Sequence, residues 1–263
     1  MKETKAVAPA KFAPRMENSS DPWYAEWFGS RYYKLLYCGR DQKEADRFIG
    51  NLVNHIGLGR GANVLDLACG TGRHSRTLHS LGLNVIGIDQ SEEAINEASV
   101  SAANGLDFFV HDMRGLYWAD HFDLIVNLFT SFGYFHSTDD DLRVLHGVHD
   151  SLLVGGHFIL DFMNVGLTIA RLVPNETIER ESVTFNISRR IKNGMILKQI
   201  EVVDGETTMH FTEEVDVLTP EQLLGYHDEV GLQVKHIFGD YDLSPFEPAV
   251  SPRFIVLSER TAA

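Results

Sequence analysis

Three aspartates, Asp66, Asp89 and Asp112, are spaced 23 residues apart, and each follows a short apolar run. The first leads into a loop with two glycines, Gly70 and Gly72, within the stretch VLDLACGTGRHS, and then into the pattern of a helix. Glycine lets the backbone approach a ligand closely, and a helix start presents free N–H groups at its positive end. The combination predicts a cradle for an anionic group with carboxylates nearby.

Two anionic groups compete for this loop: the pyrophosphate of a dinucleotide and the carboxylate of a methionine tail. The dinucleotide fingerprint G-x-G-x-x-G has Ser75 at its third glycine position here. Asp66 would also repel a pyrophosphate, whereas it would attract an amino group and a sulfonium. We therefore expect S-adenosylmethionine, with Asp89 accepting hydrogen bonds from both ribose hydroxyls and Asp112 accepting one from the adenine amino group.

Apolar runs of strand length alternate with helical patterns between residues 41 and 162. The expected strands are 62–67, 83–88, 106–110, 122–128 and 157–162. The expected helices are 41–57, the segment from the glycine loop to about Leu81, the segment capped by Ser91, and 139–154. The alternation predicts an α/β fold, doubly wound and mostly parallel, with helices on both faces of the sheet. Because parallel strands end at one sheet edge, the three aspartates should converge where such folds bind ligands.

The pattern changes after Asn164. Residues 177–218 favour strands, and Asn193-Gly194 and Asp204-Gly205 suit two-residue hairpin turns, so we expect a three-stranded antiparallel meander. The remaining expected elements are a helix that starts at Thr219-Pro220 and stops at Gly231, and strands at 232–241 and 253–259.

Composition limits the choice of partners and location. The 263-residue chain has a formal net charge of −14, which disfavours nucleic acid and anionic membranes as partners. It has two cysteines and no apolar run of transmembrane or signal-peptide length, so we expect a cytoplasmic protein. Residues 1–20 indicate a flexible tail; Glu3 and Glu17 speak against a transit peptide.

Four motifs together carry a family resemblance. VLDLACGTGRHS is followed by VIGIDQSEEAI, then FFVHDMR, then FDLIVNLFTSFGYF. In this order they resemble class I S-adenosylmethionine-dependent methyltransferases between about Phe48 and Phe162. The resemblance implies a Rossmann-like sheet of seven strands whose last strand is antiparallel. It also implies that S-adenosyl-L-homocysteine is the product left after transfer.

A looser resemblance covers most of the chain. YYKLLYCGRD, SFGYF and the antiparallel insertion after the fifth strand are similar to small-molecule N-methyltransferases, namely amino-sugar N,N-dimethyltransferases and, more distantly, glycine N-methyltransferase. This resemblance implies a small-molecule acceptor, with an amine nitrogen as the methylated atom. The implied segments are a tail at 1–20, a helical and aromatic lid at 21–57, a cofactor-binding core at 58–163, an antiparallel insertion that walls the substrate pocket at 164–218, and a helix with two strands that complete the core sheet at 219–263.

The resemblance assigns candidate site residues. Those expected to bind the cofactor are Tyr33, Arg40, Asp66, Ala68, Cys69, Gly70, Gly72, Asp89, Gln90, Asp112, Met113, Asn127, Leu128 and Phe129. Tyr134 and His136 are the candidates for assisting loss of the amine proton, and no metal site is expected. Core packing is the alternative for Tyr33, Met113 and Tyr134, and Arg73 competes with Arg40 as the partner of the cofactor carboxylate.

Rival functions remain open at this point. A nicotinamide-dependent oxidoreductase would need the missing third glycine and would have to tolerate Asp66. A non-catalytic cofactor-binding protein, an oxygen acceptor and a protein acceptor are further alternatives. The sequence leaves the identity of the acceptor and the oligomeric state undecided, with a homodimer among the alternatives.

Overall fold

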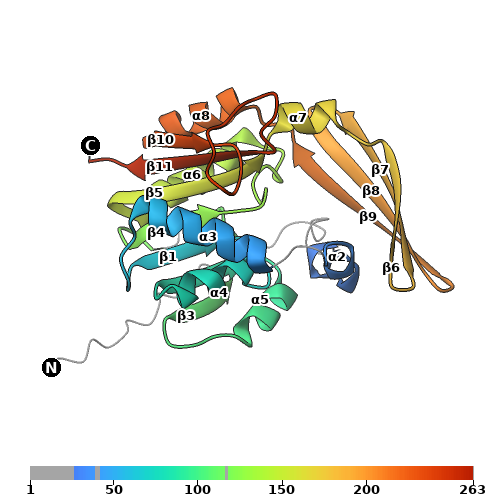
Figure 1. Ribbon diagram of the computed structural model, residues 1–263, viewed down its shortest axis with the longest axis horizontal. Coiled ribbons are helices and arrows are strands. Elements are labelled where there is room, and N and C mark those ends of the chain that lie inside the picture. Colours follow the sequence, from blue (N-terminus) through green and yellow to red (C-terminus); the bar gives the residue numbers. More distant parts are fainter. Residues whose placement is uncertain (1–26, 39–41, 116–117, 263) are drawn as a thin grey trace.

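The computed structural model describes residues 27–38, 42–115 and 118–262 (Figure 1). The expected tail at 1–20 and the candidate Arg40 lie outside the described residues. The helices are α2 Arg31–Leu36, α3 Gln42–Ile56, α4 Arg73–Ser80, α5 Glu92–Ser99, α6 Thr138–Ser151, α7 Val165–Ala170 and α8 Pro220–Glu229. The strands are β1 Asn63–Leu67, β2 Asn84–Asp89, β3 Leu106–Val110, β4 Phe122–Asn127, β5 Leu152–Met163, β6 Asn175–Arg180, β7 Val183–Lys192, β8 Met195–Asp204, β9 Thr207–Asp216, β10 Leu232–Phe238 and β11 Arg253–Arg260.

Seven strands form the main sheet in the order β10-β11-β5-β4-β1-β2-β3. β11 runs antiparallel to both of its neighbours, β5 and β10, and the remaining pairs are parallel. The order reverses at β1, which pairs with β2 on one side and β4 on the other. The expected Rossmann-like α/β sheet with an antiparallel last strand is therefore confirmed.

Helices cover both faces of this sheet, as the continuous apolar runs in its strands require. Val64 faces one core cluster, which includes Phe48 and Leu52 of α3. Leu65 and Leu67 point the other way, into a cluster with residues of α6 and α8. Alternation along β1 thus builds two separate hydrophobic layers, and these layers hold the sheet edge rigidly in place.

A second sheet, β6-β7-β8-β9, follows α7 and is antiparallel throughout. The prediction of three strands is wrong because the stretch before Asn193, expected to be one strand, is divided at Glu181 into β6 and β7. The β6 sequence NETIER is polar and almost entirely exposed, so this edge strand lacks the apolar alternation that identifies a half-buried strand. The turn from β6 to β7 passes through Glu181, whose φ is 54°.

The two predicted hairpin turns have different outcomes. Asn193-Gly194 is confirmed, with positive φ at both residues between the paired Lys192 and Met195. The second turn is shifted by one residue, because Asp204 pairs with Thr207 and leaves Gly205-Glu206 as the loop. Of these two loop residues only Gly205 has a positive φ, which fits a turn with glycine at its first central position.

The boundary between α6 and β5 also differs from the prediction. The helix ends at Ser151 rather than near 154, and Leu152 already belongs to the strand. Gly155 and Gly156 lie inside β5, beside a shift in its register with β4. A Cβ on Gly156 would lie 2.9 Å from the carbonyl oxygen of Phe122, so the glycine pair permits an irregular strand instead of ending a helix. At the expected start of α8, the Thr219–Gln222 capping box is present.

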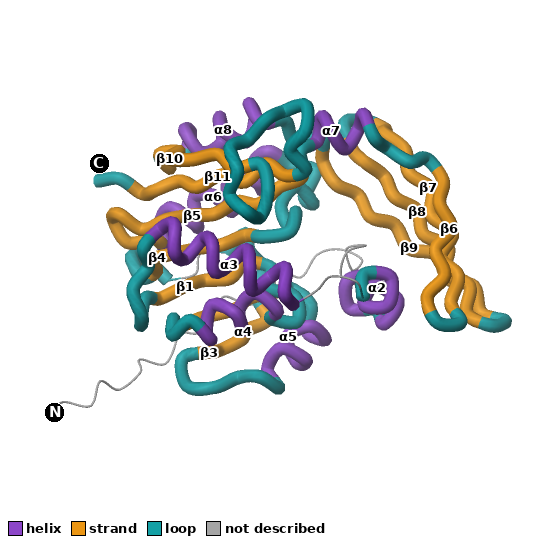
Figure 2. Tube along the Cα trace, in the orientation of Figure 1, coloured by secondary structure: helices purple, strands orange, loops and turns teal. Residues whose placement is uncertain are grey.

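Helix α2 occupies the space between the main sheet and the second sheet (Figure 2). Trp27, Tyr32 and Leu36 are buried against Phe185 and Ile200 of the second sheet. The segment 27–38 therefore packs on the insertion, while its other side faces the core. Among the residues that the structure describes, no helix has both the length and the apolar character needed to cross a membrane.

We expect Gly72→Ala to destabilise the fold. Gly72 is the N-cap residue of α4 with a φ of 79°, and a Cβ there would lie 2.7 Å from the Phe108 ring. The strain should lower the free energy of unfolding by about 1–3 kcal/mol in urea denaturation. Gly50→Ala in α3 is the matched control, because nothing lies within 4 Å of its added Cβ; it should raise stability by about 0.5–1 kcal/mol. Wild-type stability of the Gly72 variant would contradict the packing described.

Candidate active site

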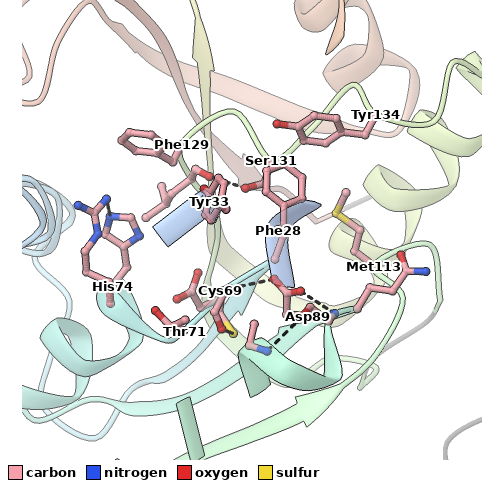
Figure 3. Close-up of a pocket in the computed structure, with 18 of the residues that line it drawn as sticks. Phe28, Tyr33, Cys69, Thr71, His74, Asp89, Met113, Phe129, Ser131 and Tyr134 are labelled. Carbon is pink, nitrogen blue, oxygen red and sulfur yellow. Dashed lines mark hydrogen bonds between the residues drawn. The ribbon is translucent and has the colours of Figure 1, made fainter. Parts of the chain in front are cut away.

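A cavity of about 360 Å³ lies at the carboxyl ends of the central strands (Figure 3). Its lining comes from the core, from the segment 27–38 and from β9. The predicted site residues that line it are Tyr33, Asp66, Ala68, Cys69, Gly70, Asp89, Gln90, Met113, Leu128, Phe129 and Tyr134. The predicted residues Gly72, Asp112, Asn127 and His136 do not line it. The volume is at the small end of the range for ligand sites.

The glycine loop is fixed by the carboxylate of Asp89. Its Oδ2 accepts a hydrogen bond from the Gly70 N–H at 2.8 Å, and its Oδ1 accepts one from the Ser91 N–H at 2.8 Å. Both Ala68 and Gly70 have positive φ, at 57° and 56°. Burial raises the pKa of Asp89, although these backbone donors oppose the shift. One side chain at the end of β2 thus joins the loop after β1 to the start of α5.

Asp66 is a buried acid at the base of the cavity. Its side chain is 1% exposed, and Oδ2 accepts a hydrogen bond from Ser75 Oγ at 2.5 Å. Burial raises the pKa of Asp66 to about 7, opposed by the Ser75 hydrogen bond, and the negative charge of Asp89 adds to the rise. A cationic ligand group beside Asp66 would favour the ionised carboxylate.

The third aspartate of the series faces a different partner. The carboxylate of Asp112 accepts hydrogen bonds from the Arg114 guanidinium, from Nε at 3.1 Å and from Nη2 at 2.6 Å. Arg114 also reaches Asp140 on α6 at 3.1 Å. Despite burial, which acts the other way, these bonds hold the pKa of Asp112 below its ordinary value. Met113, which lies between Asp112 and Arg114 in the sequence, points its side chain into the cavity (Figure 3).

The loop after β4 forms the opposite wall and is held by a buried ion pair. Phe129 and Thr130 have φ of 66° and 61°, an uncommon conformation for residues with side chains. Asp161 accepts the Phe129 N–H at 2.8 Å and pairs with Arg253 at 2.7 Å. The Tyr241 hydroxyl donates to the same carboxylate at 3.2 Å. This network offsets the local strain and fixes where Phe129 meets the cavity.

Asn127 lies beneath this loop. Its side chain is fully buried, and Nδ2 donates to the Leu67 carbonyl oxygen at 3.2 Å and lies 3.8 Å from Met113 Sδ. The side chain thereby ties the end of β4 to the end of β1. Its neighbours along the chain, Leu128 and Phe129, reach the cavity itself.

The two candidate catalytic residues are placed differently. Tyr134 lines the cavity, with its ring 5.8 Å from that of Phe28. His136 is exposed and turned toward β9, where Nδ1 lies 2.8 Å from Asp216 and Nε2 lies 3.3 Å from Glu214. His136 therefore anchors the loop to the insertion rather than facing the cavity.

Sequence reasoning missed Glu213, which lines the cavity from β9. Its carboxylate accepts hydrogen bonds from Trp27 Nε1 at 2.6 Å and from the Tyr37 hydroxyl at 2.9 Å. The sequence did contain a signal for Glu213. Phe211, Glu213 and Val215 occupy every second position of β9, so Glu213 shares a face of the strand with two apolar residues. A charged residue in that register points inward, where it needs a partner.

Further lining residues come from segments that the sequence singled out only in part. Arg73, the competitor of Arg40, lines the cavity with its guanidinium 5.3 Å from the Phe129 ring centroid. Other lining residues that the sequence did not single out include Phe28, Lys34, His74, Ala94, Ser131 and Phe135. Within the described parts of the chain, no His, Cys, Asp or Glu cluster could hold a metal ion.

Part of this chain is similar in sequence to known methyltransferases. Residues 64–156 match a methyltransferase domain family. The methyltransferase YqeM of Bacillus subtilis is 34% identical over 117 residues, which are 43% of this chain and 47% of that protein. The match thus spans about half the length of that relative. The cypemycin N-terminal methyltransferase of a Streptomyces species is 27% identical over 76% of this chain and 84% of its own.

A solved structure is similar to this chain in its fold. An S-adenosylmethionine-dependent methyltransferase from Clostridium acetobutylicum superposes with a TM-score of 0.74 at 24% identity, covering 88% of this chain and 96% of its own. At this identity the likeness concerns the fold.

We expect Arg253→Met to lower the free energy of unfolding by about 3–5 kcal/mol, because it leaves the fully buried Asp161 without its charge partner. Lys235→Met is the matched control, since Lys235 pairs with Glu259 at 3.1 Å on the surface. That loss should be below about 1 kcal/mol. Chemical denaturation of both variants measures the difference, and equal losses would show that the buried pair does not hold the loop.

Proposed function

We propose that the whole protein transfers the methyl group of S-adenosyl-L-methionine to a small-molecule amine, in keeping with the methyltransferase domain that residues 64–156 match. The observation that carries this proposal is the meeting of Asp66, Gly70 and Asp89 in one cavity at the sheet edge. When bound, S-adenosyl-L-methionine supplies an electrophilic methyl group on a positively charged sulfur. Loss of this methyl group leaves S-adenosyl-L-homocysteine.

The residues present fit this cofactor. Asp89 uses one acceptor position on each oxygen for the Gly70 and Ser91 N–H groups, which leaves lone pairs for a ribose diol. Asp66, buried with a pKa raised to about 7, is suited to meet a cation. Met113, with its thioether in the cavity, offers an apolar surface to the adenine. The contact of Asp112 with the adenine amino group stays a prediction, since its carboxylate is engaged by Arg114.

The protein's main contribution to methyl transfer is alignment. An in-line displacement with a neutral leaving group needs its reactants held in one geometry, and this can supply about 7–11 kcal/mol. The sheet edge holds the cofactor. The loop after β4 and the insertion face the acceptor. Among the candidate catalytic residues, Tyr134 is placed to contact an acceptor, whereas His136 would act through the loop it anchors.

An amine acceptor is favoured by two observations. Glu213 adds a third carboxylate to the cavity lining, beside Asp66 and Asp89. The relative with 84% of its length covered is named for methylating an N-terminus. An oxygen or protein acceptor and a non-catalytic role are the alternatives. Incubation with isotopically labelled S-adenosyl-L-methionine and pairs of amines with their matching alcohols separates the nitrogen from the oxygen acceptor: label should enter the amines, and label in alcohols alone would refute the amine.

The proposed small-molecule acceptor implies no role for nucleic acid or membranes as partners. A cytoplasmic location and a homodimer stay predictions from the sequence.

We expect Asp89→Ala to weaken binding of S-adenosyl-L-methionine by about tenfold or more, because a charge-assisted pair of hydrogen bonds is worth about 1.5–3 kcal/mol. Asp107→Ala on β3 is the matched control, since Asp107 is exposed and does not line the cavity. Isothermal titration calorimetry compares the two variants. Unchanged affinity in the Asp89 variant would remove this residue from the site.

We expect affinity for the cofactor to rise with pH between about 5.5 and 7. In the free protein burial raises the pKa of Asp66 to about 7, so the carboxyl is protonated below this pH. A bound cation favours the ionised form, so binding releases a proton, and affinity gains up to about tenfold per pH unit below 7. Burial raises the pKa of Asp89 as well, which acts in the same direction.

Asp66→Asn isolates the contribution of Asp66, because the amide cannot titrate. Calorimetry in buffers of different ionisation enthalpy counts the protons released. The variant should show a flatter pH dependence and less proton release than the wild type. Identical profiles for the two proteins would assign the titration elsewhere.

A further inference from the structure

Four aromatic rings form a continuous strip along one wall of the cavity. The ring centroids of Tyr37 and Tyr33 are 5.0 Å apart, those of Tyr33 and Phe28 are 5.0 Å apart, and those of Phe28 and Tyr134 are 5.8 Å apart. All four residues line the cavity. We call them the aromatic strip. It runs from the segment 27–38 to the loop after β4, and Figure 3 shows Phe28, Tyr33 and Tyr134 across the cavity from Cys69 and Thr71 of the glycine loop.

The carboxylate of Glu213 lies at the Tyr37 end of the strip. Glu213 accepts the Tyr37 hydroxyl at 2.9 Å, and both belong to the cavity lining. Lys198 on the adjacent strand lies 3.3 Å from Glu213 Oε2 but does not line the cavity. Trp27, which is fully buried, donates to Oε1 at 2.6 Å. These donors come from the insertion and the lid segment, so they hold the carboxylate in a fixed orientation.

The lining cations are already matched by carboxylates outside the cavity. Lys34 pairs with Glu97, and its Nζ lies 3.7 Å from Glu93. Arg73 lies 3.8 Å from Glu44. The lining therefore offers two acids at the glycine loop and a third, Glu213, at the far end of the aromatic strip, where Lys198 balances part of its charge from outside the cavity. The Lys198 ammonium lies 4.6 Å from the Tyr37 ring centroid, so a ligand cation would lie beside the rings of Tyr33, Phe28 and Tyr134, with the Glu213 carboxylate at one end of the strip.

We propose that the aromatic strip and Glu213 form the acceptor subsite, and that it selects amines that already carry alkyl groups, that is secondary or tertiary amines. The proposal rests on the proposed function. Aromatic faces attract alkylated ammonium ions electrostatically, and the attraction grows when water is excluded. An alkylated nitrogen has few N–H groups, so it loses few hydrogen bonds to water when it is placed against rings. A primary ammonium would lose more of them.

The subsite also fits the charge movement of the reaction. The nitrogen lone pair forms the new N–C bond while the C–S bond breaks, and its electron pair goes to sulfur. The sulfur becomes neutral and the nitrogen becomes cationic. The product from a secondary amine then releases its N–H proton to water, whereas a tertiary amine becomes a quaternary ammonium ion, which has no N–H proton to release. Groups that stabilise positive charge at nitrogen act more strongly on the transition state than on the neutral amine.

The test uses two probes of nearly equal shape in the presence of saturating S-adenosyl-L-homocysteine. Choline carries a trimethylammonium group, and 3,3-dimethylbutan-1-ol carries a neutral tert-butyl group in its place. We expect the wild-type chain to bind choline at least about fivefold more tightly than the neutral alcohol, measured by calorimetry or ligand-observed NMR. Equal or weaker binding of choline would overturn the proposal, and this comparison requires no variant.

A variant pair separates the ring from a general effect on folding. Phe28→Leu removes a ring of the strip and should lower choline affinity by about fivefold, whereas Phe28→Tyr keeps the ring and should restore most of it. Glu213→Gln should lower choline affinity and leave that of the neutral alcohol unchanged. Equal losses for both probes in Glu213→Gln would show that the carboxylate only supports the fold.

The failure of this inference can be told apart from that of the proposed function. Binding of S-adenosyl-L-homocysteine without preference for choline would overturn the acceptor subsite alone. Absence of S-adenosyl-L-homocysteine binding in the wild-type chain would overturn the proposed function, and the subsite with it. Methyl transfer from S-adenosyl-L-methionine to primary amines, with secondary and tertiary analogues inert, would also overturn the subsite.

Discussion

The carboxylate of Asp89 is the link on which the site depends. It ends β2 and accepts N–H groups from Gly70 and Ser91, so it joins two loops that belong to different strands. Since β1 and β2 are neighbouring parallel strands, both loops meet at one edge of the sheet. The link orients the glycine loop and still leaves lone pairs on the same carboxylate, which a ligand in the cavity can use.

The cavity is completed by parts of the chain that are distant in sequence. The buried Asp161–Arg253 pair holds the Phe129 loop in an uncommon backbone conformation, and β9 contributes Glu213 from the insertion. The segment 27–38 packs on the insertion and presents its aromatic residues to the core. Acids on both sides of the cavity leave it suited to positively charged groups, as the proposed cofactor and acceptor both require.

Features set by local pattern could be predicted from the sequence, and features set by tertiary contacts could not. The 23-residue spacing of the aspartates located the sheet edge because it reflects the repeating strand-helix unit. Strand β6 was missed because its polar residues lie on an exposed edge. Asp112 follows its strand as expected, yet the nearby Arg114 competes for its carboxylate, and Glu213 reaches the cavity only through the position of the second sheet.

The central claim is that the glycine loop holds S-adenosyl-L-methionine rather than a dinucleotide. Calorimetric titration of the chain with S-adenosyl-L-methionine and, separately, with NAD tests it directly. The structure predicts binding of the first ligand and none of the second, because Asp66 lies at the base of the cavity, where it would repel a pyrophosphate. Binding of NAD alone would contradict the account of Asp66, and the proposed methyl transfer would fall with it.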